Sequence, residues 1–173
     1  LEEKVTSLED RFYDPGYRIV DGERINCWRL HGHGSQSMVD GLNNSCNSVF
    51  VDLALRLGKD RMYSYFEKYG FGNLTNVDFS GESAGIIMDK DTAKKVDLAR
   101  MGFGQAIAVT PLQQIRAISS VVNGGTLYRP YFVSKISSST GSFEKDFSPV
   151  AVRSVISSET SAKIRYMLEQ VIV

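Results

Sequence analysis

The sequence predicts a mixed α+β fold in which helices predominate. Residues 11–28 are rich in strand-forming side chains and are interrupted by two turn signals, Asp14-Pro15-Gly16 and Asp21-Gly22. Residues 49–57 carry apolar side chains at helical spacing, and Thr110-Pro111-Leu112-Gln113 is typical of a helix start. With 173 residues, 42% of them hydrophobic, the chain can form the core of one domain or most of one.

Three helices are predicted in the first half of the chain. Residues 35–44 form a short helix, because Met38 and Leu42 lie four residues apart. The second helix ends at Gly58 as its C-cap, and its apolar stripe consists of Val49, Phe50, Leu53, Ala54 and Leu57. The third covers residues 59–69, and its inner face is Met62, Tyr65, Phe66 and Tyr69.

The middle of the chain is predicted to be irregular before it becomes helical again. Residues 73–105 are rich in Gly, Asp and Lys with little periodicity, so we expect a surface excursion in which the charged stretch 90–100 is a solvated loop. Thr110 then caps a helix that begins at Pro111, and Gln113 completes the capping box. The buried face of this helix is predicted to be Ile115, Ile118 and Val122.

The last third of the chain is predicted to contain an extended segment, a polar loop and a helix. Residues 127–136 read as extended, with Pro130 favouring an edge position, and residues 137–148 form a polar hairpin-type loop. The last helix begins after Ser157, and its inner face is predicted to be Ile164, Met167, Leu168 and Val171.

Charge and hydropathy exclude two kinds of partner. Twenty basic residues balance twenty acidic ones, so the chain has no field that would attract nucleic acid or anionic lipid. No stretch approaches the ~20 apolar residues that span a bilayer, and no signal peptide opens the chain. Residues 1–5 read as the tail of a helix and residues 167–173 as an interrupted element, so we expect a piece of a longer protein.

Ser45 and Asn47 lie between two predicted helices, where a loop can present both side chains at the edge of a pocket. A serine hydroxyl there could relay a proton, and an asparagine amide both donates and accepts hydrogen bonds. The same pattern is common at helix starts. The structural alternative is therefore that Asn44 or Ser45 only caps the helix that begins near Ser48.

Four motifs in a fixed order together give the chain a family resemblance. They are Cys27 with Gly32-His33-Gly34 and Asn44-Ser45-Cys46-Asn47, then Tyr69-Gly70-Phe71-Gly72 with 77–85, then Gly102-Phe103-Gly104-Gln105 with 109–113, and finally 123–130. In this order they resemble the transpeptidase domain of class B penicillin-binding proteins, over essentially all 173 residues. Within that family the chain most resembles the clostridial or bacillar type that includes the sporulation-specific member.

The resemblance implies both a fold and an activity. The fold would be the helical and loop-rich portion of a penicillin-binding, serine β-lactamase-like domain, with the central antiparallel sheet incomplete. The activity would be that of a D,D-transpeptidase, which cross-links peptidoglycan stem peptides through a serine acyl-enzyme and is acylated by β-lactams. Ser45 would pass a proton between the catalytic lysine and the amine, and Asn47 would hold the amide of the donor peptide. A membrane anchor, an extracytoplasmic location and a membrane glycan polymerase as partner are also implied.

The resemblance further implies which active-site motifs to expect outside the chain. The acylated serine of the family lies in a Ser-x-x-Lys motif, expected just before Leu1, and a Lys-Thr-Gly strand is expected shortly after Val173. The chain would then hold one of three active-site motifs and would not catalyse alone. The alternative is a non-catalytic structural or interaction module on the same fold, which the sequence before Leu1 would distinguish.

Three side chains near the Ser45 motif suit tetrahedral zinc: Cys27, His33 and Cys46. The glycines that flank His33 allow the loop to bend close to an ion. Zinc-containing members of the family resemble this chain in an Asp-Pro-Gly…His…Cys arrangement, which implies Asp14 as the fourth ligand of a closed structural site.

Other residues and other states of the cysteines remain as alternatives to that ligand set. His31 is the rival histidine and Asp40 the rival carboxylate. The two cysteines could instead form a disulfide, which is compatible with an oxidising compartment, or remain free buried thiols.

Overall fold

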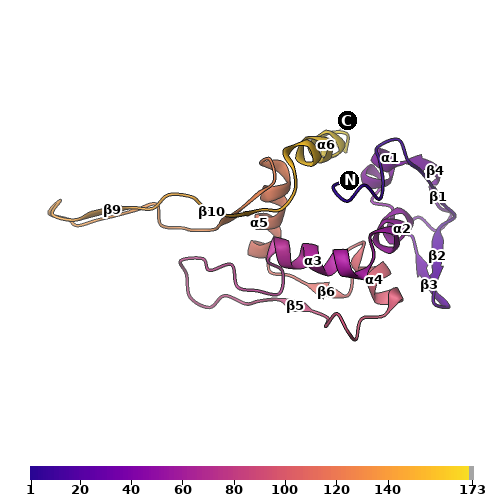
Figure 1. Ribbon diagram of the computed structural model, residues 1–173, viewed down its shortest axis with the longest axis horizontal. Coiled ribbons are helices and arrows are strands. Elements are labelled where there is room, and N and C mark those ends of the chain that lie inside the picture. Colours follow the sequence, from indigo (N-terminus) through magenta and orange to yellow (C-terminus); the bar gives the residue numbers. More distant parts are fainter. Residues whose placement is uncertain (172–173) are drawn as a thin grey trace.

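The computed structural model describes residues 1–171, which fold into six helices and ten short strands. The helices form the middle of the molecule, strands β1–β4 lie at one end, and a thin hairpin arm extends from the other end (Figure 1). None of the described helices has the length and apolarity that a membrane crossing requires. The helices are α1 (Met38–Asn43), α2 (Asn47–Leu57), α3 (Lys59–Tyr69), α4 (Lys95–Met101), α5 (Pro111–Val122) and α6 (Ser158–Glu169).

The strands between residues 1 and 171 form five separate antiparallel pairs. The predicted α+β class is confirmed, and within this part of the chain no larger sheet joins the pairs. The pairs are β1 (Arg11–Asp14) with β4 (Gly34–Ser37), β2 (Tyr17–Val20) with β3 (Glu23–Asn26), β5 (Ile86–Ile87) with β6 (Ile107–Ala108), β7 (Thr126–Arg129) with β10 (Val150–Ser154), and β8 (Lys135–Ser137) with β9 (Glu144–Asp146).

The turn signals in residues 11–28 are confirmed. Strands β2 and β3 are joined by Asp21 and Gly22, which both have positive φ (49° and 81°). Two positive φ angles are typical of the tight turns that match the twist of a hairpin. The next segment was assigned incorrectly in part: residues 34–37 are strand β4, and helix α1 begins only at Met38. Ser37 caps α1 through a capping box with Asp40, which is a local signal inside the predicted helix.

Helices α2 and α3 have the predicted extents, and Gly58 ends α2 as expected. The expectation of an irregular, solvated 90–100 segment is wrong, because α4 lies there and buries Val96, Leu98, Ala99 and Met101. Its apolar side chains pack against α2, where Val51 joins the same cluster. A helix this short is stabilised mainly by tertiary packing and only weakly by its own helix propensity. The charged residues around its few apolar positions left no helical periodicity to recognise in the sequence.

Helix α5 begins as predicted and faces the core differently. Thr110 is its N-cap, with Pro111 in the first turn and a complete capping box. The predicted buried face is wrong: Ile115 and Ile118 are 62% and 52% exposed, and the buried side chains are Gln113, Ala117 and Ser120. Gln113 is tolerated inside because its amide donates to two backbone carbonyls, those of Asn73 and Ala84, and accepts from Thr110 N.

The two ends of the chain differ from the prediction. The single extended segment 127–136 is two strands, β7 and β8, which pair with different partners. Within α6, Met167 is buried, but Leu168 is 37% exposed, and Val171, after the helix, is 50% exposed. Residues 1–5 form turns and not a helix, and Lys4 has a positive φ of 54°, which a helix does not allow. Helix α6 ends at Glu169, and Ile172 and Val173 of the predicted last element lie outside the described residues.

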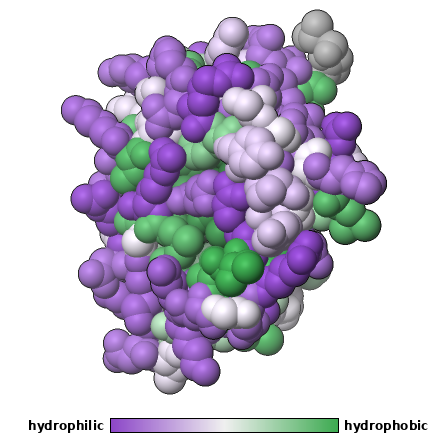
Figure 2. All heavy atoms as spheres, turned by 90° about the vertical axis from the view of Figure 1, so that its right-hand side faces the viewer, coloured by the Kyte–Doolittle hydropathy of each residue, from purple (hydrophilic) through white to green (hydrophobic). Residues whose placement is uncertain are grey.

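Among residues 1–171, one of the three apolar core clusters holds the predicted site. Both cysteines lie in it, and its buried members are Phe12, Cys27, Met38, Cys46, Val49 and Met167. At the end of the molecule where β1–β4 lie, the surface is mostly hydrophilic and is crossed by a band of apolar side chains (Figure 2). The core therefore joins the strands of the N-terminal region to α2 and α6 around the two cysteines.

Removing the cap of α5 should destabilise the protein. Thr110→Ala deletes the hydroxyl that accepts from Gln113 N at 3.1 Å, and we expect it to lower the free energy of unfolding by about 1 kcal/mol. Urea denaturation of the full-length protein measures this change. Thr140→Ala, in the exposed turn of the β8–β9 hairpin, is the control, and equal stability of the two variants would contradict the assignment.

Candidate active site and metal centre

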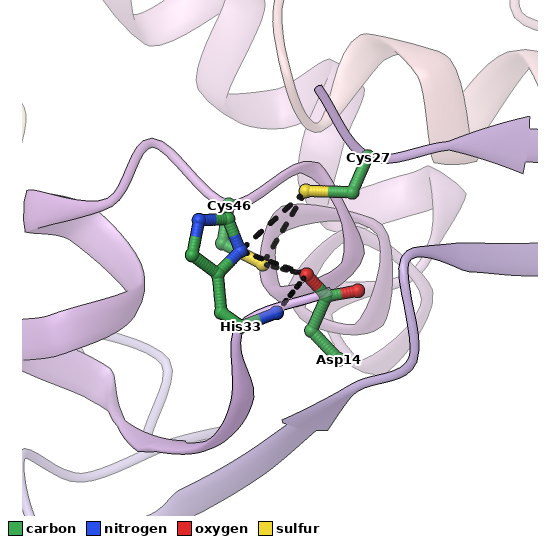
Figure 3. Close-up of side chains that lie close together, drawn as sticks. All are labelled: Asp14, Cys27, His33 and Cys46. Carbon is green, nitrogen blue, oxygen red and sulfur yellow. Dashed lines mark hydrogen bonds and ion pairs between the residues drawn. The ribbon is translucent and has the colours of Figure 1, made fainter. Parts of the chain in front are cut away.

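Four separate elements bring Asp14, Cys27, His33 and Cys46 together; these residues are the four-residue cluster below. Asp14 ends β1, Cys27 follows β3, His33 precedes β4, and Cys46 is the N-cap of α2. The β1–β4 register places Asp14 opposite Gly34, beside His33. Cys27 N donates to Gly16 O at 2.8 Å, which holds the end of β3 against the turn after β1. The four side chains point toward one another (Figure 3).

The ligand atoms of the four-residue cluster all lie within 4.8 Å of one another. Asp14 Oδ2 lies 2.8 Å from His33 Nδ1 and 3.2 Å from Cys46 Sγ. Cys27 Sγ lies 3.7 Å from His33 Nδ1 and 3.9 Å from Cys46 Sγ, and the two sulfurs are not bonded. The structure therefore shows two free cysteines where a disulfide was one alternative.

Two glycines allow the backbones around the four-residue cluster to touch. A Cβ on Gly32 would lie 2.2 Å from Asp14 O, and a Cβ on Gly16 would lie 2.2 Å from Leu30 O. Both residues also have positive φ, 75° and 96°. Any side chain at these positions would push the Asp-Pro-Gly turn away from the loop that carries His33. The glycines thus permit the close approach that leaves Asp14 Oδ2 2.8 Å from His33 Nδ1.

The pKa values of Asp14 and Cys46 are shifted in opposite directions. Burial alone raises the pKa of the Asp14 carboxyl, but hydrogen bonds from Ser48, His33 and other donors outweigh it and hold that pKa well below its ordinary value. Burial raises the pKa of the Cys46 thiol to about 12. Without a metal, Cys46 is therefore a thiol that donates to an ionised Asp14.

The rival residues lie outside the four-residue cluster. His31 is exposed, and Asp40 is occupied in the capping box of α1, where its Oδ2 accepts from Ser37 N and Oγ at 2.8 and 2.7 Å. The His33 side chain, in contrast, is 2% exposed. Its Nδ1 faces Asp14 and Cys27, while its Nε2 is buried without a hydrogen-bond partner among the described residues.

Residues 44–47, the Ser45 loop, present polar side chains beside the four-residue cluster. Ser45 is exposed and has a left-handed φ of 46°, and Cys46 behind it is fully buried. Asn47 Nδ2 donates to Asn26 O at 3.1 Å, which ties the loop to the end of β3. The capping alternative is wrong, because neither Asn44 nor Ser45 occupies the N-cap of α2: that position is Cys46, which makes no side-chain cap bond.

Two residues of the site were missed in the sequence. Ser48 Oγ donates to Asp14 Oδ1 at 2.6 Å, and Trp28 Nε1 donates to Asn44 O at 2.8 Å. Ser48 had been considered only as a helix start. Each bond joins positions far apart in the chain, so no local pattern predicts it. The one signal in the sequence is that Ser48 directly follows Asn47 and Trp28 directly follows Cys27.

A Ser-x-x-Lys tetrad does occur in the chain, although none was expected inside it. It is Ser142-Phe143-Glu144-Lys145, in the exposed β8–β9 hairpin. Ser142 Oγ contacts the hydroxyls of Ser138 and Thr140, and Lys145 lies over the ring of Phe147. The hairpin projects from the end of the molecule opposite β1 and β4 (Figure 1). This tetrad is therefore no partner of Ser45.

Comparison with known proteins decides the family. The family model described as "Penicillin binding protein transpeptidase domain" matches residues 1–172. The chain belongs to this penicillin-binding protein transpeptidase family. It is 45% identical over 172 residues to stage V sporulation protein D of Bacillus subtilis, a match that covers 99% of this chain and 27% of that protein.

More distant relatives agree with this assignment. The peptidoglycan D,D-transpeptidase MrdA of Haemophilus influenzae is 27% identical, and the match covers 78% of this chain and 22% of that protein. The crystal structure of penicillin-binding protein 3 from Mycobacterium tuberculosis, complexed with aztreonam, superposes with a TM-score of 0.89 at 26% identity and covers 99% of this chain and 38% of that one. The chain spans about a quarter of the length of the curated relatives that it matches.

The bond from Ser48 should contribute measurably to stability. Ser48→Ala removes a 2.6 Å hydrogen bond to a buried carboxylate, and we expect a loss of about 1.5–3 kcal/mol in the free energy of unfolding, the range for bonds to charged groups. Urea denaturation of the full-length protein is the measurement. Ser119→Ala, at an exposed position of α5, should leave stability unchanged, and a Ser48 variant as stable as this control would refute the role.

Proposed function

We propose that the chain is part of a peptidoglycan D,D-transpeptidase that cross-links stem peptides by acyl transfer. The observation that carries the proposal is the match of the transpeptidase family over residues 1–172, together with a Ser45 loop held on a buried cluster. A serine outside residues 1–173 attacks the penultimate D-Ala carbonyl and expels the terminal D-Ala, and an amine of a neighbouring peptide then releases the acyl group. The chain alone would be inactive.

Each polar side chain of the Ser45 loop has a separate role in this proposal. Ser45 is exposed, so its hydroxyl can exchange a proton with the catalytic lysine and with the leaving or incoming amine. Asn47 Nδ2 donates to Asn26 O, which fixes the plane of the side-chain amide. Oδ1 of Asn47 then accepts a hydrogen bond from a peptide N–H of the donor stem peptide. Ser45 and Asn47 would thus act on the proton and on the position of the substrate.

The proposed ligands of the enzyme follow from its relatives. Crystal structures of the similar Mycobacterium tuberculosis protein carry aztreonam and ampicillin, so we propose that the complete domain of this chain is also acylated by β-lactams. The similar Bacillus subtilis protein is named for stage V of sporulation, which supports a role in peptidoglycan made during sporulation. A membrane anchor, an extracytoplasmic active site and a membrane glycan polymerase as partner complete the proposal.

We further propose that Asp14, Cys27, His33 and Cys46 hold one structural zinc ion. Zinc bonds of about 2.0–2.3 Å place tetrahedral ligand atoms roughly 3.3–3.8 Å apart. Four of the six separations, 2.8, 3.2, 3.7 and 3.9 Å, surround that range, and all six lie within 4.8 Å, so small movements would admit an ion. Two thiolates, one imidazole nitrogen and one carboxylate oxygen form a closed set of four ligands with no position for an activated water.

Zinc would add a cross-link between elements that otherwise meet through apolar packing and hydrogen bonds. Ser48 Oγ and Gly16 N hold the second oxygen of Asp14, at 2.6 and 2.8 Å, and so orient the first toward the centre of the cluster. Because Cys46 is flanked by Ser45 and Asn47, fixing its sulfur fixes the backbone that presents both side chains. The ion would therefore affect acylation without touching the substrate.

Ser45→Ala in the full-length protein should slow acylation by a β-lactam. The loss expected for a proton-transfer group is about 10²–10⁴-fold in the acylation rate constant, measured by stopped-flow with a fluorescent penicillin. Asn47→Ala should impair turnover of a stem-peptide substrate more than it lowers thermal stability. Parental acylation rates in both variants would refute these roles, and a parental protein that no β-lactam labels would favour a non-catalytic module.

Loss of the metal should be visible without any activity assay. We expect one zinc per chain by elemental analysis of the full-length protein, its loss in Cys46→Ala and His33→Ala, and a fall of roughly 5 °C or more in Tm. His31→Ala is the matched control, since His31 is exposed and outside the four-residue cluster. Metal-free parental protein with the same Tm as zinc-supplemented protein would sink the proposal.

A further inference from the structure

Trp28, the only tryptophan of the chain, joins the four-residue cluster to the Ser45 loop. The residue is 63% exposed, yet its Nε1 donates a hydrogen bond of 2.8 Å to the backbone carbonyl of Asn44. Water is available to an indole this exposed, so a short bond to one carbonyl indicates that the ring is held in a fixed orientation. The acceptor belongs to the residue directly before Ser45.

The indole ring of Trp28 also contacts the four-residue cluster. Its ring meets the His33 ring edge-to-face, with centroids 5.2 Å apart and planes inclined by 66°. His33 is itself fixed by Asp14, which accepts from both its backbone N and its Nδ1. The backbone of Trp28 directly follows Cys27, whose N is bonded to Gly16 O. Both the main chain and the ring of Trp28 are therefore positioned by members of the cluster.

The carbonyl that accepts from Trp28 belongs to the peptide group directly before Ser45. A peptide group is planar, so anchoring Asn44 O also orients the Ser45 N–H, which donates to Leu42 O at 2.9 Å. Ser45 has a φ of 46°, a left-handed conformation that side chains other than glycine adopt at an energetic cost and keep only where the surroundings impose it. That torsion sets the direction in which the Cα–Cβ bond of Ser45 leaves the backbone.

We propose that Trp28 is a positioning residue for Ser45, and that it transmits the order of the four-residue cluster to the loop through its indole N–H. The inference rests on the proposed acyl-transfer function, in which Ser45 relays a proton. Without the Trp28 bond, the Asn44–Ser45 peptide keeps only the bond from Ser45 N to Leu42 O, and Ser45 can leave its left-handed conformation. The hydroxyl would then be misplaced, although Asp14, Cys27, His33 and Cys46 keep all their contacts.

The first test removes the N–H donor and keeps an aromatic ring at position 28. Trp28→Phe in the full-length, zinc-loaded protein should reduce the acylation rate constant for a fluorescent penicillin about 10-fold or more, the scale of a small misplacement of a reacting group. The dissociation constant of the initial penicillin complex, the zinc content and Tm should stay near the parental values. Tyr166→Phe, which removes a hydroxyl from a half-exposed ring on α6, is the matched control and should acylate at the parental rate.

A second variant covers the case in which Trp28→Phe also lowers zinc content or Tm. Replacing Trp28 by benzothienylalanine keeps the bicyclic shape and exchanges only the N–H for a sulfur atom, so the contact with His33 survives. The same slow acylation at parental Tm supports the inference, whereas parental acylation in this variant overturns it. If Ser45→Ala is slow while the Trp28 variants are not, the positioning role fails and the proposed function stands; if the parental protein is not acylated, the proposed function itself fails.

Discussion

The buried carboxylate of Asp14 is the constraint on which the arrangement of residues 14–48 depends. A carboxylate in an apolar core is unfavourable unless hydrogen bonds replace its water. Here Gly16 N and Ser48 Oγ reach one oxygen, and His33 N, His33 Nδ1 and Cys46 Sγ reach the other. These donors come from the turn after β1, the loop before β4 and the start of α2. The hydrogen bonds that the Asp14 carboxylate requires therefore fix the relative positions of these three segments.

The same constraint explains how one short loop can serve two kinds of chemistry. Around the start of α2, successive residues alternate between exposed and buried: Ser45 is exposed, Cys46 is buried, Asn47 is half-buried and Ser48 is buried. Cys46 and Ser48 contact Asp14, whereas Asn47 turns to the end of β3. The inward residues hold the start of α2 on Asp14, and in the proposed function the side chains of Ser45 and Asn47 act on the substrate. A change in the inward set should therefore appear as altered kinetics as well as altered stability.

Much of the fold was predictable because its signals are local. The Asp21-Gly22 turn, the Gly58 C-cap and the Thr110 capping box depend on residues within a few positions of one another. Helix α4 and the buried face of α5 were not predictable in this way, because they depend on contacts with α2 and with the carbonyls of Asn73 and Ala84. Hydrophobic periodicity treats Gln113 as surface and Ile115 as core, and tertiary hydrogen bonding reverses both.

The candidate site divides in the same way. Cys27, His33 and Cys46 were identifiable because cysteine and histidine are the usual ligands of zinc and the three residues lie within a short stretch of the sequence. Ser48 and Trp28 act through single hydrogen bonds to positions 34 and 16 residues away. Serine and tryptophan have many ordinary roles, so nothing in their identity indicates such a partner. Only the geometry of the folded chain connects them with Asp14 and Asn44.

Cys46 forgoes the helix-capping hydrogen bond that its position allows, and its sulfur contacts other members of the four-residue cluster instead. It is the N-cap of α2, where serine, asparagine or aspartate would satisfy a free backbone N–H and stabilise the helix by about 1 kcal/mol. Cys46 makes no such bond, and the first turn of α2 carries no acidic residue. Its sulfur lies instead 3.2 Å from Asp14 and 3.9 Å from Cys27. A residue that weakens its own helix yet is fully buried in the four-residue cluster is explained by the contacts of its sulfur, and those contacts hold Ser45 and Asn47 in place.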